Sequence, residues 1–215
     1  MVITKVEEFT KNRSKIYIDE EFAFVLYKGE LRLFGVKVGT ELSVDNYSKI
    51  MTEILPKRAK MRAMNLLQSR DYTRSALADK LKAGFYPQEV IEEALDYVAS
   101  YHYIDDVRYS KSYIHYNQER KSRKVIELEL LRKGVSKTDI EAGWREWYEE
   151  GNAQNEEEQI IRLLEKKHFQ NVSSDPKQRQ KIYAFLLRKG FSMESVSRAV
   201  KRYNADALGD DFYLT

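Results

Sequence analysis

The stretch Leu131-Arg132-Lys133-Gly134-Val135 occurs twice more in related form, as Leu81-Lys82-Ala83-Gly84-Phe85 and as Leu187-Arg188-Lys189-Gly190-Phe191. Each version has a Leu, two residues that are mostly basic, a Gly and an apolar residue. A helix that ends at a Gly with positive φ satisfies its last carbonyl groups, and basic residues in its last turn complement the helix dipole. We therefore predict that a helix ends at each version, with its glycine in the left-handed region.

The pattern continues beyond the three glycines. Val90, Ile140 and Val196 each follow a glycine by the same interval, and Ser136 and Ser192 are placed to cap the next helix. The interval between glycines varies, which indicates a repeat with loops of different length. With one more helix upstream of each pair, the sequence predicts a mainly α protein of three tandem three-helix repeats in an elongated array.

The first part of the chain has a different pattern. Lys15–Asp19 alternates between polar and apolar residues, and Phe22–Tyr27 is aromatic and β-branched. Lys28-Gly29 is a turn signal, after which we expect Leu31–Phe34 to return as the second arm of a hairpin. Because so small a hairpin is marginal alone, it should form a sheet of about three strands or lean on the helices.

These patterns divide the chain into five segments. They are residues 1–48 for the small N-terminal sheet, 49–108, 109–152 and 153–205 for helical repeats 1, 2 and 3, and 206–215 for an acidic tail. Pro56, Pro87 and Pro176 each stand where a helix can begin, since a proline in the first turn loses no hydrogen bond.

Composition narrows the class of protein. The chain has no Cys, which excludes disulfides and thiolate metal sites, and no apolar run long enough to cross a membrane. The first residues do not resemble a signal peptide, so we expect a cytoplasmic protein. The formal net charge is only +3, but basic residues gather in 55–82 and 177–202 and acidic ones in 141–158. Such segregation suits a polyanion or a charged protein partner, although it also fits solvated helix faces.

Residues from about Arg62 to Tyr109 resemble the RecX family. The resemblance rests on Leu66–Arg74, on Gly84-Phe85 and on Asp105-Asp106-Val107-Arg108-Tyr109. The other two repeats match more loosely through Leu-Arg-Lys-Gly, so the resemblance covers residues 56–205. Where family members often carry an acid after a Ser/Thr-Arg pair, this chain has Ala76, which weakens one helix cap.

The resemblance implies a negative regulator and not an enzyme. Members of this family bind the RecA–DNA filament along its helical groove and suppress its recombinase and coprotease activities. The expected partner is therefore the RecA filament, with direct contact to single- or double-stranded DNA left open, and we expect a monomer. A helix-turn-helix protein that acts directly on DNA is the alternative. A purely structural repeat scaffold also fits the architecture, but it gives no reason for the charge segregation.

Basic residues at equivalent helix ends are the candidates for contact with RecA or DNA, because equivalent positions of a stacked array tend to line one face. They are Arg74, Lys82, Arg120, Lys121, Arg123, Lys124, Arg132, Lys133, Arg188, Lys189, Lys201 and Arg202. A second set defines the repeat and family motif and consists of Gly84, Asp105, Asp106, Arg108, Gly134 and Gly190. The alternative role for the basic residues is to cap helices and keep the protein soluble.

No arrangement of residues indicates catalysis, a metal or a cofactor. The three His residues are far apart in sequence, and Asp105-Asp106 is a helix cap more readily than a Mg²⁺ pair. Tyr109, Tyr113 and Tyr116 could stack on nucleic acid bases, but their helical spacing favours packing between helices. Trp144 and Trp147 are expected in the core of a repeat.

The predicted array has a measurable consequence in solution. A compact domain of this length would have a radius of gyration of about 17 Å. Three modules in a row would instead extend over about 75 Å. Small-angle scattering distinguishes the two, and a radius near the compact value would contradict the array.

Overall fold

The computed structural model describes residues 1–171 and 174–210, so residues 211–215 of the predicted acidic tail lie outside the described residues. The described part is mainly helical and contains a three-stranded sheet. The chain divides into two compact units, of which the first ends at Asp105 and the second begins at Asp106. No helix in the described ranges is long and apolar enough to cross a membrane.

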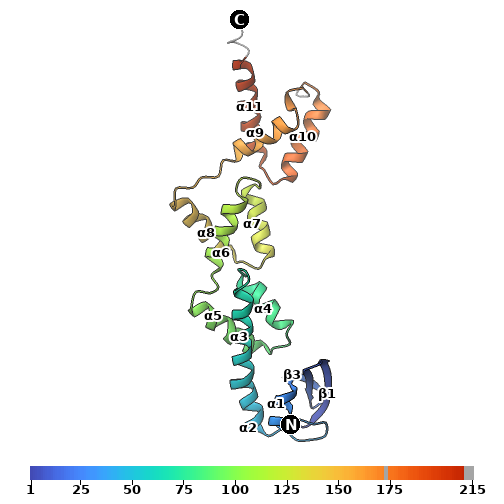
Figure 1. Ribbon diagram of the computed structural model, residues 1–215. Coiled ribbons are helices and arrows are strands. Elements are labelled where there is room, and N and C mark those ends of the chain that lie inside the picture. Colours follow the sequence, from blue (N-terminus) through green and yellow to red (C-terminus); the bar gives the residue numbers. More distant parts are fainter. Residues whose placement is uncertain (172–173, 211–215) are drawn as a thin grey trace. The chain divides into compact units, whose positions relative to one another are not determined.

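The first unit contains three strands, followed by helices (Figure 1). Its elements are β1 (Ile3–Thr10), β2 (Arg13–Ile18), β3 (Glu21–Tyr27), α1 (Lys28–Leu33), α2 (Val44–Lys49), a π-helical turn (Ile50–Ile54), α3 (Leu55–Leu67), α4 (Arg74–Lys82) and α5 (Gln88–Ser100). We call α3, α4 and α5 module 1.

The second unit contains two more groups of three helices. Its elements are α6 (Asp106–Asn117), α7 (Arg123–Arg132), α8 (Lys137–Glu149), α9 (Glu156–Lys166), a short 3-10 turn (Phe169–Asn171), α10 (Pro176–Arg188) and α11 (Met193–Asp210). We call α6–α8 module 2 and α9–α11 module 3. The three predicted three-helix repeats are therefore confirmed.

The three strands form an antiparallel sheet in the order β1-β2-β3. Ile3 of β1 pairs with Ile18 of β2, and a tight turn joins β2 to β3. The turn residues Asp19 and Glu20 both have positive φ (49° and 73°), as a type I′ hairpin turn requires. The expectation of a small N-terminal sheet is confirmed.

The predicted second hairpin arm at Leu31–Phe34 is wrong, because Lys28–Leu33 forms helix α1. The side chain of Glu30 favours this helix: its Oε2 accepts the N–H of Tyr27 (2.7 Å) and also a hydrogen bond from Arg58 Nη1 (2.8 Å). The third strand of the sheet is instead β1, at the start of the chain. The sequence pattern did not indicate this strand, because its charged and apolar residues do not alternate strictly.

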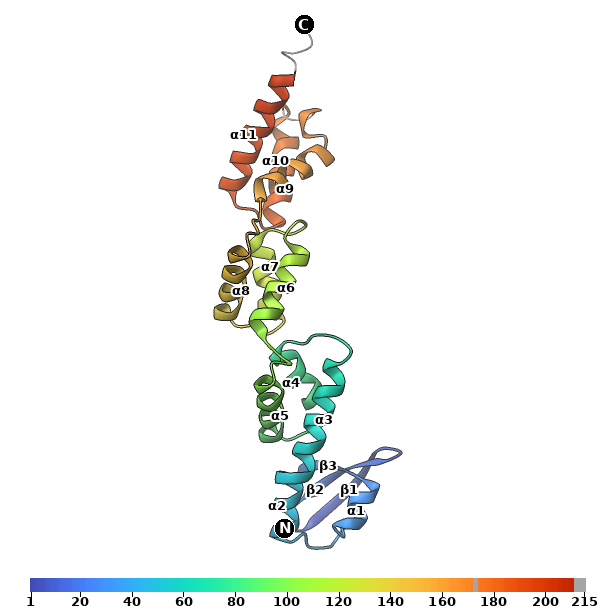
Figure 2. The same cartoon turned by 60° about the vertical axis from the view of Figure 1, so that its left-hand side comes forward.

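The sheet and module 1 share one hydrophobic core. Ile16 and Phe24 of the sheet are buried in the same cluster as Leu55, Leu77 and Ile91 of the helices. Figures 1 and 2 both show the sheet beside the helical segment that runs from α2 into α3. The strands therefore fold together with module 1.

Pro56 stands in the first turn of α3, as expected, but α3 follows directly on another helical turn. A proline inside a helix has no N–H to donate, and its ring crowds the preceding turn. The five residues before Leu55 form a π-helical turn, in which the N–H of Leu55 donates to the carbonyl of Ile50. This wider turn lets α2 and α3 follow one another without a break. The predictions for Pro87, just before α5, and Pro176, in the first turn of α10, are confirmed.

Modules 2 and 3 each have a core of their own. Trp144 and Trp147 are buried in module 2, as predicted, together with Ile126 and Leu130. The core of module 3 gathers residues of α9, α10 and α11 around Phe169. Each module thus buries one face of all three of its helices.

The second helix of every module ends in a turn that contains one residue with positive φ. These residues are Phe85 (61°), Gly134 (80°) and Gly190 (88°). The N–H of each donates at 2.9 Å to the carbonyl three residues earlier, which belongs to Lys82, Leu131 and Leu187, respectively. The prediction is confirmed for Gly134 and Gly190 and is wrong for Gly84, whose place is taken by Phe85.

The predicted register of the first repeat is consequently off by one residue. In modules 2 and 3 the residue four positions before the left-handed residue is a buried leucine, Leu130 or Leu186. In module 1 the residue four positions before Phe85 is Leu81, which is also buried. The residues aligned with Leu81 in the predicted register, Leu131 and Leu187, are 37% and 39% exposed.

The start of the third helix gives the same register. Its N-cap residue follows the left-handed residue by two positions in every module and is Pro87, Ser136 or Ser192. Ser136 accepts the N–H of Asp139 (3.1 Å), which confirms the predicted cap. The basic pair of modules 2 and 3 therefore corresponds to Ala83-Gly84 in module 1.

Phe85 can occupy the left-handed position because the sheet holds its ring. The ring lies edge-to-face against Phe9 (5.0 Å) and Phe22 (5.8 Å), and the ammonium group of Lys15 lies 4.1 Å from its centre. For a residue other than glycine this backbone conformation costs about 1–2 kcal/mol, and aromatic pairs of this kind offset about 0.5–1.5 kcal/mol each.

Polar contacts join modules 2 and 3 within the second unit. Ser122 Oγ donates to the carbonyl of Lys189 (3.0 Å), and the N–H of Arg123 donates to Glu156 Oε1 (2.9 Å). Gly190 permits this approach, since a Cβ there would lie 2.5 Å from Ser122 Oγ and 2.7 Å from Val125 Cγ2. Glycine is thus required at Gly190 by both its backbone and its neighbours.

We call this contact between modules 2 and 3 the joint. Because Gly190 lies in the joint, we expect Gly190→Ala to lower the free energy of unfolding more than Gly151→Ala does. Gly151 is a matched control, because its φ of +84° is close to the +88° of Gly190, yet no atom lies within 4 Å of the place that a Cβ would take there. Both variants share left-handed strain of about 1–2 kcal/mol, and only Gly190→Ala adds a collision.

Urea unfolding followed by tryptophan fluorescence measures the difference, because both Trp residues of the chain lie in module 2. An equal decrease in the free energy of unfolding for the two variants would show that the joint does not depend on the missing side chain.

Candidate interaction surface

Arg74 and Arg123 hold together the helices of their own modules. Each is the first residue of the second helix and contacts the third. Arg74 Nη2 donates to Glu92 (3.0 Å) and Asp96 (2.7 Å) of α5, and the guanidinium of Arg123 lies over the ring of Trp144 in α8 (4.9 Å). These two candidates therefore have a structural role at equivalent positions.

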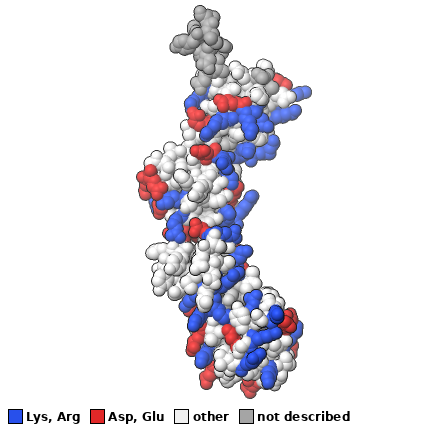
Figure 3. Space-filling model, in the orientation of Figure 1, with Lys and Arg blue, Asp and Glu red and all other residues white. Residues whose placement is uncertain are grey.

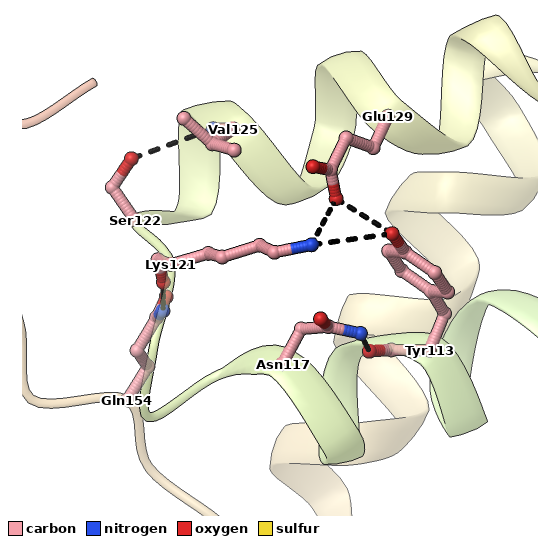
Figure 4. Close-up of polar contacts among 7 residues, drawn as sticks. All are labelled: Tyr113, Asn117, Lys121, Ser122, Val125, Glu129 and Gln154. Atoms are coloured by element: carbon pink, nitrogen blue, oxygen red, sulfur yellow. Dashed lines mark hydrogen bonds and ion pairs between the residues drawn. The ribbon is translucent and has the colours of Figure 1, made fainter. Parts of the chain in front are cut away.

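Lys121 belongs to a polar network inside module 2 (Figure 4). Its Nζ and the hydroxyl of Tyr113 both donate to Glu129 Oε2, each at 2.6 Å. The hydrogen bond to Glu129 raises the pKa of Lys121. Burial opposes the charged form of Glu129, but the hydrogen bonds from Lys121 and Tyr113 outweigh it and lower its pKa. Lys121 thus ties its loop to α7.

Three further candidates contact neighbours in their own module. The Nζ atoms of Lys133 and Lys189 lie 5.3 Å from the ring centre of Tyr113 and 5.6 Å from that of Phe185. Arg202 Nη2 donates to Glu158 Oε1 (2.7 Å), which links α11 to α9. Cations over rings keep their outer face in water, so the two lysines remain accessible.

The remaining candidates are exposed and form no ion pair with any residue in the described ranges. They are Lys82, Arg120, Lys124, Arg132, Arg188 and Lys201. Their charge is therefore available to a partner. Lys82, however, corresponds to Leu131 and Leu187 and not to the basic pair, so module 1 does not extend the predicted stripe.

The joint between modules 2 and 3 brings several of these cations together. The Ser122–Lys189 hydrogen bond places the segment from Arg120 to Lys124, which leads into α7, beside the end of α10. Arg120 also lines a shallow pocket of about 240 Å³ with Arg162 and Lys166 of α9. Glu119 is the acidic residue of that lining. We call the cations of these adjoining segments the joint patch; they are Arg120, Lys124, Arg162, Lys166, Arg188 and Lys189. Figure 3 shows Lys and Arg side chains gathered over α9 and α10.

Arg132 lies at the other end of α7 from the joint. The ten residues of α7 span about 15 Å at 1.5 Å per residue, so the cations of Arg132-Lys133 form a separate group. The single stripe expected from the sequence is thus divided into two groups within the second unit.

Two other expectations concern the motif residues and the tyrosines. Asp106 is the first residue of α6, and Asp105 precedes it. The described residues contain no group of three or more His, Asp or Glu side chains placed to hold a metal ion. Tyr109 and Tyr113 stack at 6.4 Å and pack on the core of module 2, whereas Tyr116 is 79% exposed and does not.

Several supporting residues were not predicted. Glu129 and Gln154 hold the loop that carries Arg120, since Gln154 Nε2 donates to the carbonyls of Gln118 (3.0 Å) and Lys121 (2.8 Å). Arg162 adds its charge to the joint patch. No periodic signal marks these side chains, because their partners are in another helix or loop.

Three family models match this chain in order. The first, second and third three-helix domains of RecX match residues 59–97, 105–143 and 155–200. These ranges coincide with modules 1, 2 and 3.

Relatives and solved structures match most of the chain's length. Regulatory protein RecX of Caldanaerobacter subterraneus subsp. tengcongensis is 31% identical over 202 residues, which is 93% of this chain and 98% of the relative. The protein of that name from Limosilactobacillus reuteri is 30% identical, and the match covers 93% of this chain and 75% of the relative.

A crystal structure of regulatory protein RecX superposes with a TM-score of 0.63 at 26% identity, covering 93% of this chain and 98% of that one. The crystal structure of RecX from Lactobacillus salivarius shares the fold, with a TM-score of 0.62 at 24% identity over 71% of this chain and 98% of that one. With its three helical domains matched in order and a relative similar along nearly its full length, this chain belongs to the RecX family.

Proposed function

We propose that this protein is a negative regulator of RecA, which binds the RecA–DNA filament along its groove and inhibits the recombinase and coprotease activities. It acts in the cytoplasm, by binding and not by catalysis. The observation that carries this proposal is the similarity of almost the whole chain to proteins named regulatory protein RecX. The expected partner is the protein filament, with the DNA inside it as a second possible contact.

The distribution of charge supports a charged partner for the second unit. Arg132 and Arg188 occupy equivalent positions in modules 2 and 3, and both are exposed without an ion pair among the described residues. The joint patch adds cations from adjoining segments of modules 2 and 3. Exposed charges of one sign steer a partner of the opposite sign and set the orientation in which it docks.

Reversal of two charges in the joint patch should weaken inhibition of RecA. The variant Arg120→Glu with Arg188→Glu should need at least about ten times more protein for half-inhibition of strand exchange, because like charges across an interface cost several kcal/mol and 1.4 kcal/mol is a factor of about ten. Strand exchange and coprotease activity are measured at two salt concentrations.

The matched control is Lys137→Glu with Arg145→Glu, two exposed residues of α8 outside the joint patch. It changes the net charge by the same amount and should inhibit like the parent. Circular dichroism verifies the fold of both variants. A folded joint-patch variant that inhibits RecA as well as the control does would place the interface elsewhere.

A further inference from the structure

A cleft of about 770 Å³ lies in the first unit between the tip of the β1–β2 hairpin, α3 and the end of α4. We propose that this cleft is a binding site for single-stranded nucleic acid. We call it the N-terminal groove; it is lined by Phe9, Thr10, Asn12, Arg13, Tyr27, Arg58, Met61, Arg62, Asn65, Lys80, Ala83, Gly84 and Tyr86. This site goes beyond the proposed regulation of RecA, because it requires no other protein.

The lining of the groove is strongly cationic. Arg13 comes from the hairpin, Arg58 and Arg62 from α3, and Lys80 from α4, while no carboxylate is among the lining residues. Arg62 and Lys80 are exposed and form no ion pair in the described part of the chain. Guanidinium groups suit phosphate oxygens in particular, because they can donate two parallel hydrogen bonds.

Arg58 is held in place within the lining of the groove. Its Nη1 donates to Glu30 (2.8 Å), its Nη2 donates to the carbonyl of Val25 (3.2 Å), and its guanidinium lies over the ring of Tyr27 (4.5 Å). These contacts join α3 to the sheet. Because the ion pair with Glu30 offsets the charge of Arg58, the charge offered to a ligand comes from Arg13, Arg62 and Lys80.

Aromatic rings stand beside these charges. Tyr27 is 41% exposed, and Phe9 and Tyr86 also line the groove. Arg13 lies over Phe9 at 5.1 Å. Arg58 also lies over the ring of Tyr86 at 5.9 Å, and Tyr27 is the most exposed ring of the lining. Rings that alternate with cations are the arrangement that binds single strands, since phosphates meet the cations and bases stack on exposed rings.

The shifted register of module 1 places two small residues in the lining of the groove. Ala83 and Gly84 line it, at the positions that carry Arg132-Lys133 in module 2. The ring of Tyr86 packs against Gly84, and the Phe9–Phe85 contact holds the hairpin tip beside this helix end. Module 1 thus has no basic pair at this helix end and has instead a groove whose cations come from three elements.

A single strand fits this groove better than the other anions that a cell offers. The bases of a duplex are stacked inside the helix and cannot reach rings in a cleft, whereas those of a single strand are free to do so. An acidic protein segment would satisfy the cations but would leave the rings without matching partners.

Fluorescence anisotropy with a labelled oligothymidylate, the full-length protein and no RecA tests the site. Arg62→Glu with Lys80→Glu should raise the Kd at least about tenfold. The slope of log Kd against log salt should fall by about 0.7 for each phosphate that the variant no longer neutralises. The matched control is Lys37→Glu with Lys49→Glu, two exposed lysines of the same unit that do not line the groove. It should bind like the parent, and circular dichroism verifies all folds.

Photo-cross-linking with bromouracil-substituted oligonucleotide locates the bound strand. The proposal expects cross-links on Phe9, Tyr27 or Tyr86. It is overturned if the groove variant binds as well as its control, or if every cross-link falls after Asp105. Displacement of the oligonucleotide by an equal concentration of poly-glutamate, without cross-links to the rings, would instead assign the groove to an acidic protein segment. None of these outcomes depends on RecA, so the regulatory proposal stands or fails separately.

Discussion

Each three-helix module depends on the turn between its second and third helices. One residue there has positive φ, and two residues later a cap begins the next helix. The turn satisfies the last carbonyls of one helix and redirects the chain so that the third helix returns across the first two. In module 2 the N–H of Val135 donates to the carbonyl of Leu130 across this turn (3.1 Å), and both side chains are buried. Without this change of direction, the apolar faces of the three helices could not meet.

The chain meets this constraint in two ways, and the difference separates its two units. Gly134 and Gly190 adopt positive φ at little cost, and Gly190 also lets module 3 approach Ser122 closely. Phe85 adopts it against its preference and is held by aromatic contacts from the sheet. The N-terminal strands are thus tied to module 1 through the same turn that defines the module.

The charged residues have two different roles, to stabilise a module or to contact a partner. Arg74 and Arg123 begin equivalent helices and bind within their modules, so their charge stabilises the fold. Cations in the last turn of the second helix, such as Arg132 and Arg188, have no such partner among the described residues and carry the proposed contact with RecA. In module 1 the small residues Ala83 and Gly84 stand at these positions and line the N-terminal groove instead. Two surfaces of different chemistry can therefore arise from one repeated helical unit.

The sequence by itself determined the number of modules, the glycine turns of modules 2 and 3, the serine cap at Ser136 and the buried tryptophans. These features are local, because helix periodicity, capping and turn preference act over a few residues. Only the tertiary structure decided that Phe85 replaces Gly84 in the first turn and which cations are paired. It also decided that Arg13 and Arg62 face one groove. Each of these depends on contacts between segments far apart in the chain, such as Phe9 with Phe85, and no short sequence pattern records which distant side chains will meet.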